Sequence, residues 1–233
     1  MKPKNPMKPT ILRYSVADTS SVSSVSSDTS DSSLMPKPYT PNDKWSQRAA
    51  REGFRARSVY KLQELDERFK LLHLGMNVLD LGAAPGSWLQ YASQKVGETG
   101  KVVGLDLQAI AEVEPNVSVH RTDITDEEAV AKALQEEGLE TVDLVLSDAA
   151  PNTSGVRDVD QWRSVELTQA VCITAAKFLR SGGSCIAKVF RGADFDELLR
   201  WIKTRGIWRD VRVTKVSASR DRSIEVYLVM RKK

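Results

Sequence analysis

Three successive apolar runs in this chain each end in residue types that could bind a nucleoside. The first run, residues 78–81, leads into the turn GAAPG, where Gly82 and Gly86 let a ligand approach the backbone closely. The second run ends at Asp106, where a carboxylate can accept hydrogen bonds from both ribose hydroxyls. The third run ends at Asp123, whose carboxylate could accept a hydrogen bond from an adenine amino group. In a parallel sheet the three ends would meet at one edge and form one ligand site.

The spacing of the glycines separates this pattern from a dinucleotide-binding site. Such sites follow G-x-G-x-x-G, and Pro85 also removes an amide donor that a pyrophosphate would need. A nicotinamide-dependent oxidoreductase is therefore disfavoured, and a nucleoside ligand without phosphates is favoured. A single aspartate is more often a helix cap or a solvated loop residue. The ordered set of glycine turn, Asp106 and Asp123 instead predicts a methyltransferase that uses S-adenosylmethionine (SAM).

A second set of residues places charges in apolar surroundings. Lys188 interrupts the run SCIAKVF and Glu225 the run IEVYLVM, although charged side chains are rarely buried without a partner. Asp148 follows the apolar run TVDLVLS, and Lys61 lies in the helical segment before the first strand. Two lysines and two carboxylates at such positions suggest one buried, mutually compensating cluster. The alternative for Lys188 is an edge strand from which its ammonium group reaches solvent.

The elements that must position these residues alternate along the chain. Apolar runs predict five strands, at residues 78–81, 101–107, 117–123, 141–147 and 184–190. Helices are predicted at residues 58–70, 87–96, 126–137, 160–180 and 194–205, with Gly182-Gly183 ending the fourth of them. Residues 209–216 and 223–230 are two more strands, and the short loop between them requires an antiparallel pair. We expect an α/β, Rossmann-like SAM-dependent methyltransferase fold: a seven-stranded, mostly parallel sheet with a C-terminal antiparallel hairpin and helices on both faces.

Composition divides the 233 residues into two parts. Residues 1–40 are rich in Ser, Thr and Asp and carry several prolines, which predicts a disordered tail. Arg13 stands alone among several acidic residues, so a plain tail is favoured over a targeting peptide. The rest of the chain, residues 41–233, is expected to form a single domain.

Cysteine usage and hydropathy indicate where the protein works. Cys172 and Cys185 lie in apolar runs and match no metal-ligand spacing. This is typical of small core residues in a protein of a reducing compartment. The apolar runs are all shorter than the ~18 residues that span a bilayer. We therefore expect a cytoplasmic monomer that binds neither a membrane nor a metal.

Residues 44–61 form a basic segment with three aromatic residues among its cations. Cations neutralise phosphates and aromatic rings stack on bases, so this segment is the predicted RNA-binding surface. A solvated helix face is the alternative, and the net charge of +3 is too small to decide between them. The predicted RNA contacts are Lys44, Arg48, Arg51, Arg55 and Arg57.

Five stretches of the chain resemble the FtsJ-type ribose 2'-O-methyltransferases that act on ribosomal RNA. They are GFRARSVYKL, LDLGAAPGSW, LSDAAPNTSG, AKVFRG and SASRDRSIEVYLV, and the resemblance extends from about Lys44 to the end of the chain. It implies SAM as the cofactor and a catalytic tetrad of two lysines and two carboxylates, with Lys188 as the proton acceptor. The family commonly has a second glycine where this chain has Ser87. The implied tetrad is Lys61, Asp148, Lys188 and Glu225, and the implied cofactor contacts are Gly86, Trp88, Asp106, Asp123 and Asp148. The glycine turn itself adds Gly82 as a further predicted cofactor contact.

The resemblance also implies a substrate. We expect 2'-O-methylation of the ribose of a uridine in large-subunit (23S-type) ribosomal RNA. The substrate is expected to be the RNA within the ribosomal subunit. One alternative is the same reaction on anticodon-loop nucleotides of tRNA. A non-catalytic RNA-binding assembly factor is another, and the complete tetrad together with Asp106 and Asp123 argues against it.

Overall fold

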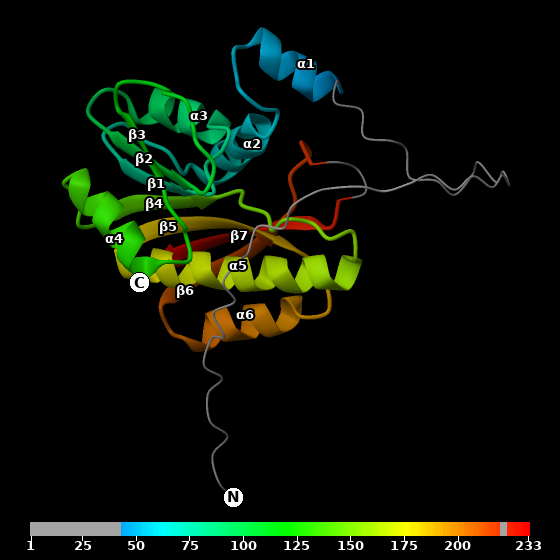
Figure 1. The fold of residues 1–233 in the computed structure, drawn as a ribbon. Coiled ribbons are helices and arrows are strands. Elements are labelled where there is room, and N and C mark those ends of the chain that lie inside the picture. The colour runs from blue at the N-terminus through cyan, green and yellow to red at the C-terminus, as the bar shows by residue number, and fades with distance from the viewer. Residues whose placement is uncertain (1–42, 220–222) are drawn as a thin grey trace, which may run out of the picture. The chain divides into compact units, whose positions relative to one another are not determined.

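The computed structural model describes residues 43–219 and 223–233, and the tail expected over residues 1–40 lies outside this part. A seven-stranded sheet in the order β3-β2-β1-β4-β5-β7-β6 forms its centre (Figure 1). The first five strands are parallel, whereas β7 is antiparallel to both β5 and β6. The expected mixed sheet is confirmed. The strands are β1 (Asn77–Leu81), β2 (Lys101–Asp106), β3 (Val117–Arg121), β4 (Val142–Ser147), β5 (Leu179–Phe190), β6 (Trp208–Thr214) and β7 (Glu225–Lys232).

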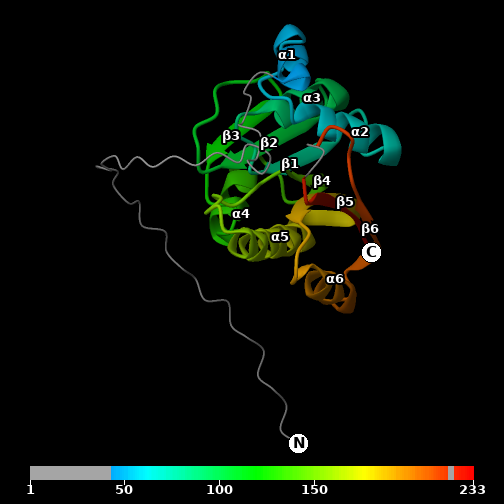
Figure 2. The same cartoon turned by 90° about the vertical axis from the view of Figure 1, so that its right-hand side faces the viewer.

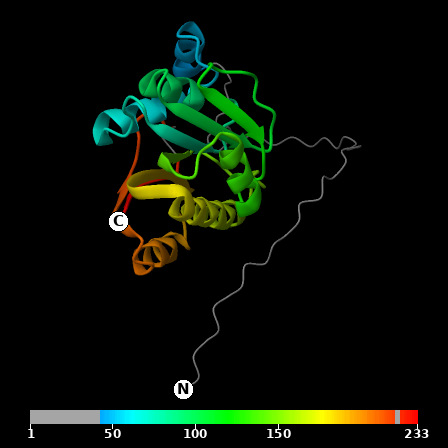
Figure 3. The same ribbon diagram turned by 90° about the vertical axis from the view of Figure 1, so that its left-hand side faces the viewer.

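Helices cover both faces of this sheet, as expected (Figures 2 and 3). One apolar cluster joins the sheet to α1, α2 and α3, and a second joins it to α4, α5 and α6. Each face thereby buries its apolar side chains under a helical layer. Among the described residues there is no helix long and apolar enough to cross a membrane. The helices are α1 (Lys44–Arg51), α2 (Val59–Phe69), α3 (Ser87–Val96), α4 (Glu127–Glu136), α5 (Arg157–Phe178) and α6 (Phe195–Thr204).

The junction of α5 and β5 differs from the sequence prediction. The helix ends at Phe178 rather than at the glycine pair, and β5 begins at Leu179. Leu179 pairs with Val142 of β4 and is 1% exposed, so its burial in the sheet determines where the strand begins. Gly182 has a φ of +77° and lies within β5, where the register against β4 shifts. The glycines therefore mark an irregularity in the strand and not the end of the helix.

Candidate active site

The carboxyl ends of β1, β4 and β5 meet at one edge because these strands are parallel neighbours. The turn after β1 and Asp148, which follows β4, therefore lie near the end of β5. β7 reaches the same edge with its first residues, where Tyr227 pairs with Lys188 and Glu225 pairs with Phe190. The sequence thus brings groups from four distant segments to one side of the sheet.

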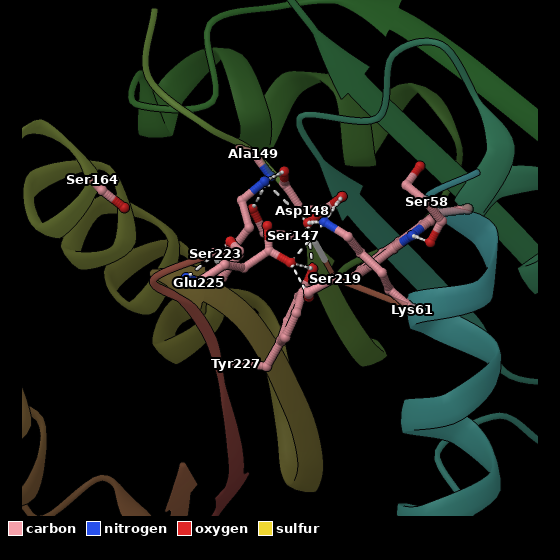
Figure 4. A network of polar contacts seen from close by, with 12 residues as sticks. Ser58, Lys61, Ser147, Asp148, Ala149, Ser164, Ser219, Ser223, Glu225 and Tyr227 are labelled. Atoms are coloured by element: carbon pink, nitrogen blue, oxygen red, sulfur yellow. Dashed lines mark hydrogen bonds and ion pairs between the residues drawn. The ribbon is translucent and has the colours of Figure 1, made fainter. Parts of the chain in front are cut away.

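Four charged side chains and one phenol form a polar network at this edge (Figure 4). Lys188 Nζ lies 3.0 Å from Asp148 Oδ1 and also donates to the Asp148 carbonyl oxygen. Lys61 Nζ, from α2, lies 2.8 Å from Glu225 Oε1 and 3.5 Å from Asp148 Oδ1. The Tyr227 hydroxyl donates to Asp148 Oδ1 at 2.6 Å. Asp148 is therefore the group that both lysines and the phenol share.

Charge compensation makes this burial possible. Lys188 and Glu225 are 8% and 9% exposed, and buried ions are tolerated only with partners. Burial would raise the pKa of Asp148, but the ammonium groups of Lys188 and Lys61 hold that pKa below its ordinary value. Burial and the carboxylates of Asp148 and Glu225 raise the pKa of Tyr227 well above its ordinary value. The phenol therefore stays protonated and serves as a donor.

Hydroxyl groups of neighbouring elements fix the strands that carry the network. Ser147 Oγ donates to the Leu81 carbonyl oxygen at 2.8 Å and joins the ends of β4 and β1. On α5, Thr168 Oγ1 donates to the Lys188 carbonyl oxygen at 2.9 Å, and Ser164 Oγ accepts from the Phe190 amide at 2.9 Å. The backbone from Lys188 to Phe190 is thus held by the long helix behind it.

The glycine turn packs directly on the segment that follows Asp148. Gly82 has a φ of +80°, which favours glycine, and a Cβ at this position would lie 2.5 Å from the Cβ of Ala149. A side chain here would therefore push the turn away from the network. The predicted role of Gly82 as a residue that permits close approach has a structural basis, although the approaching group is the protein itself.

A cavity of about 30 Å³ lies between the turn and the network, which is room for a small polar group. Asp80 lines it, is 1% exposed, and has no hydrogen-bond partner for Oδ2 within the described residues. Burial, followed by the carboxylates of Asp148 and Asp106, raises the pKa of Asp80 well above its ordinary value. The sequence prediction missed Asp80. Its carboxylate interrupts the apolar run VLDL, and a charge within an apolar run is also the signal that identified Lys188. The lining residues are Ser58, Asp80, Gly82, Ala83, Ala84, Ser87, Trp88 and Asp148.

The other predicted cofactor contacts lie partly at this cavity and partly away from it. Trp88 is buried in its lining and donates from Nε1 to the Ser58 carbonyl oxygen at 2.8 Å. Asp106 accepts from the Ala84 amide at 2.9 Å and is not part of the lining. Asp123 is exposed, and its carboxylate accepts from the amide and hydroxyl of Thr125. The structure therefore brings Trp88 and Asp148 to the cavity, and it leaves Asp106 and Asp123 at the ends of β2 and β3.

Ser87 occupies the position at which this chain departs from the FtsJ-type pattern. Its side chain is 2% exposed, and its Oγ lies 2.9 Å from Ser58 Oγ, just before α2. The hydroxyl pair joins the beginnings of α2 and α3 in the cavity lining. Serine is accommodated here because it gains a partner that glycine would lack.

Three of the five predicted RNA contacts already have partners within the protein. Arg48 bonds Glu52 at 2.7 Å and lies over the Tyr60 ring, and Arg57 bonds Asp43 and the Ala218 carbonyl oxygen. Arg55 donates to three carbonyl oxygens of two loops. The two other predicted RNA contacts, Lys44 and Arg51, are exposed on α1.

Comparison with known proteins identifies a family that matches this geometry. The sequence model described as FtsJ-like methyltransferase matches residues 54–233. The chain is 45% identical over 192 residues to ribosomal RNA large subunit methyltransferase E of Syntrophobacter fumaroxidans, covering 82% of this chain and 95% of that protein. It is 46% identical over 188 residues to the enzyme of the same name from Azoarcus sp., covering 81% and 90%.

A solved structure gives the same result. A crystal structure described as a ribosomal RNA methyltransferase from Plasmodium falciparum superposes with a TM-score of 0.68 at 28% identity. The superposition covers 77% of this chain and 98% of that one. The resemblance seen in the sequence is confirmed: this chain belongs to the FtsJ-like methyltransferase family.

Proposed function

We propose that this methyltransferase transfers the methyl group of SAM to a ribose 2'-hydroxyl of large-subunit ribosomal RNA. The observation that carries the proposal is the buried network of two lysines and two carboxylates next to the cavity of the glycine turn. The names of its relatives support ribosomal RNA as the substrate. A uridine within the ribosomal subunit in the cytoplasm is the proposed target.

The residues at the cavity fit SAM as the methyl donor. The unpartnered carboxylate oxygen of Asp80 would be satisfied by the ammonium group of the donor, and the hydroxyl pair of Ser58 and Ser87 keeps one O–H donor for a carboxylate. Asp106 would hold the ribose hydroxyls, because its carboxylate keeps lone pairs beyond the two bonds that it accepts from the protein. Asp123 would accept from the adenine amino group. When bound, SAM supplies an electrophilic methyl group on a positively charged sulfur.

Lys188 is the proposed proton acceptor for the 2'-hydroxyl. Its ammonium group must first release a proton to solvent. As a neutral amine it then has two N–H bonds, which its contacts to the carbonyl oxygen and Oδ1 of Asp148 would use. Its lone pair would then point away from Asp148 and could take the proton. With Lys61 charged and both carboxylates ionised, the cluster has a net charge of –1 before the transfer and zero after it. Proton uptake therefore restores the charge balance of a buried site.

The other members of the network would position the reacting groups. Lys61 bridges Glu225 and Asp148, and the Tyr227 hydroxyl holds Oδ1 of Asp148 in place. A base of this kind typically contributes a rate factor of ~10²–10⁴, and in-line positioning contributes more. Lys44 and Arg51 on α1 would bind phosphates of the RNA as it approaches this edge.

A side-by-side methylation assay tests the proposal. The protein is incubated with SAM labelled on its methyl group and with large ribosomal subunits, naked ribosomal RNA or tRNA, and the modified nucleotide is mapped. We expect label on one ribose of the large-subunit RNA, with the assembled subunit preferred. Labelling of tRNA alone would assign the enzyme to anticodon-loop methylation. Absence of labelling on all three, in protein that is folded, would contradict the proposal.

A further inference from the structure

Arg55 belongs to the basic segment, but its guanidinium group is bonded to two loops of the cofactor side. Nη1 donates to the carbonyl oxygens of Pro85 at 3.2 Å and of Ala111 at 2.9 Å, and Nη2 donates to that of Glu112. Pro85 lies in the glycine turn after β1. Ala111 and Glu112 lie in the loop of residues 107–116, which connects β2 to β3 and contains neither helix nor strand. One side chain thus joins the two loops.

The segment around Arg55 is itself fixed to α3. The Arg55 amide donates to Gln90 Oε1 at 2.9 Å, and Gln90 Nε2 donates to the Gly53 carbonyl oxygen at 3.0 Å. Gly86 precedes α3 with a φ of +104°, and a Cβ on it would lie 2.8 Å from Arg55 Nη1. The guanidinium group therefore packs against the backbone of the turn, at a position where a side chain would displace it.

The number and directions of these contacts suit an arginine side chain. Its three acceptors are neutral carbonyl groups, so its role does not depend on neutralising a nearby charge. A planar fork with five N–H donors can serve several acceptors in fixed directions, whereas a lysine ammonium group is a compact donor on a flexible stem. A lysine at this position would keep the charge but could not hold both loops in the same way.

Asp106 joins the same pair of loops a second time. Its Oδ2 accepts from the Ala84 amide of the turn at 2.9 Å, and its Oδ1 accepts from the Gln108 amide of the loop at 2.8 Å. The position of this carboxylate therefore depends on how the loop is held against the turn. Ordering a loop costs conformational entropy, and a loop that is ordered in advance does not add that cost to ligand binding.

We propose that Arg55 is a positioning residue for the methyl donor: it straps the loop of residues 107–116 to the glycine turn and so preorganises the nucleoside end of the donor site. This inference rests on the proposed function in that the ligand is SAM or its product, S-adenosylhomocysteine (SAH). The basic segment consequently serves two sites. Lys44 and Arg51 on α1 face the RNA, whereas Arg55, only six residues before Lys61, shapes the donor site.

Calorimetric titration with SAH tests the strap in four proteins: the wild type, Arg55→Gln, Arg55→Lys and the control Arg51→Gln. Both Arg55 variants should bind SAH at least tenfold more weakly, and Arg51→Gln should bind as the wild type does. With RNA saturating, the Arg55 variants should show a raised KM for SAM and a kcat close to that of the wild type, because the network at Lys188 is left intact. Hydrogen exchange should be faster at residues 107–116 in Arg55→Gln, and SAH should slow it there in the wild type.

The SAH affinities of the variants separate the strap from a simple effect of the Arg55 charge. Wild-type SAH affinity in Arg55→Gln would overturn the strap, and wild-type affinity in Arg55→Lys would show that charge acts instead of the fork. If Arg55→Gln does not fold, the lysine variant and the wild-type exchange data decide, and a lack of SAH-dependent protection at residues 107–116 overturns the inference. Failure of the wild type itself to bind SAH would count against the proposed function as well.

Discussion

Asp80→Asn should stabilise the ligand-free protein and weaken its binding of the methyl donor. The carboxylate of Asp80 is 1% exposed, and its Oδ2 has no partner within the described residues. A buried polar group without a partner costs about 1–3 kcal/mol. Asparagine has nearly the same shape, carries no charge, and brings amide donors toward the carboxylates of Asp148 and Asp106 that now repel Asp80. A gain of about 2 kcal/mol would raise the Tm of a domain of this size by roughly 4–8 °C.

The gain should depend on pH in a defined direction. The pKa of Asp80 is raised well above its ordinary value of 3.8, so the folded state binds a proton more tightly than the unfolded state does. The wild type therefore loses stability as pH rises through 3.8 and stops losing it above the raised pKa. The difference in Tm between Asp80→Asn and the wild type should accordingly be small near pH 4, grow with pH, and then level off.

Asp66→Asn is the matched control, since Asp66 is also a buried carboxylate but has partners. It accepts from the amides of Leu71 and Leu72 and from the hydroxyl of Tyr91. The same substitution there should lower Tm. SAH titration completes the assay: loss of a charge-assisted bond, worth about 1.5–3 kcal/mol, predicts roughly 10- to 150-fold weaker binding to Asp80→Asn. A variant that melts below the wild type, or binds SAH equally well, would refute this assignment of the cavity.

Three further experiments test the rest of the site and the basic segment. Lys188→Arg keeps the charge but cannot release its proton, so single-turnover methylation should fall nearly as far as in Lys188→Ala; near-wild-type rates at matched SAM and RNA affinity would exclude the base role. Tyr227→Phe removes a buried hydrogen bond to a carboxylate and should lower the unfolding free energy in urea by about 1.5–3 kcal/mol; equal stability would show that the bond contributes nothing. Charge reversal at Lys44 and Arg51 should weaken RNA binding and reduce its salt slope by roughly 0.7–0.9 per lost phosphate contact, with SAH affinity unchanged; an unaltered slope would mean that α1 is only a solvated helix.

The sheet could be predicted from the sequence because its strands are mostly apolar or alternating segments bounded by turns or charges. Its edge could not. Nothing in the last two runs indicates that β7 pairs with both β5 and β6 and thereby lies between them, because that choice depends on contacts between distant segments. The boundary between α5 and β5 was missed for a similar reason. Leu179 suits a helix or a strand, and its pairing with Val142 decides between them.

The charged members of the site were detectable because they interrupt apolar runs. Lys188 and Glu225 were found in this way, and Asp80 carries the same signal in VLDL although it was passed over. Tyr227 carries no such signal, since tyrosine is common in buried strands. Its part in the network follows only from the register that sets it beside Lys188 and directs its hydroxyl to Asp148.

The arginines of the basic segment show where reasoning from sequence stops. A run of cations indicates which residue types could meet phosphates, but it does not reveal which of them are already bonded within the protein. The partners of Arg55 are backbone carbonyl oxygens, which every residue has and which therefore leave no mark in the sequence. Charge alone would assign Arg51 and Arg55 the same role. Only the fold separates them, because it directs one side chain to solvent and bonds the other to the loops that hold Asp106.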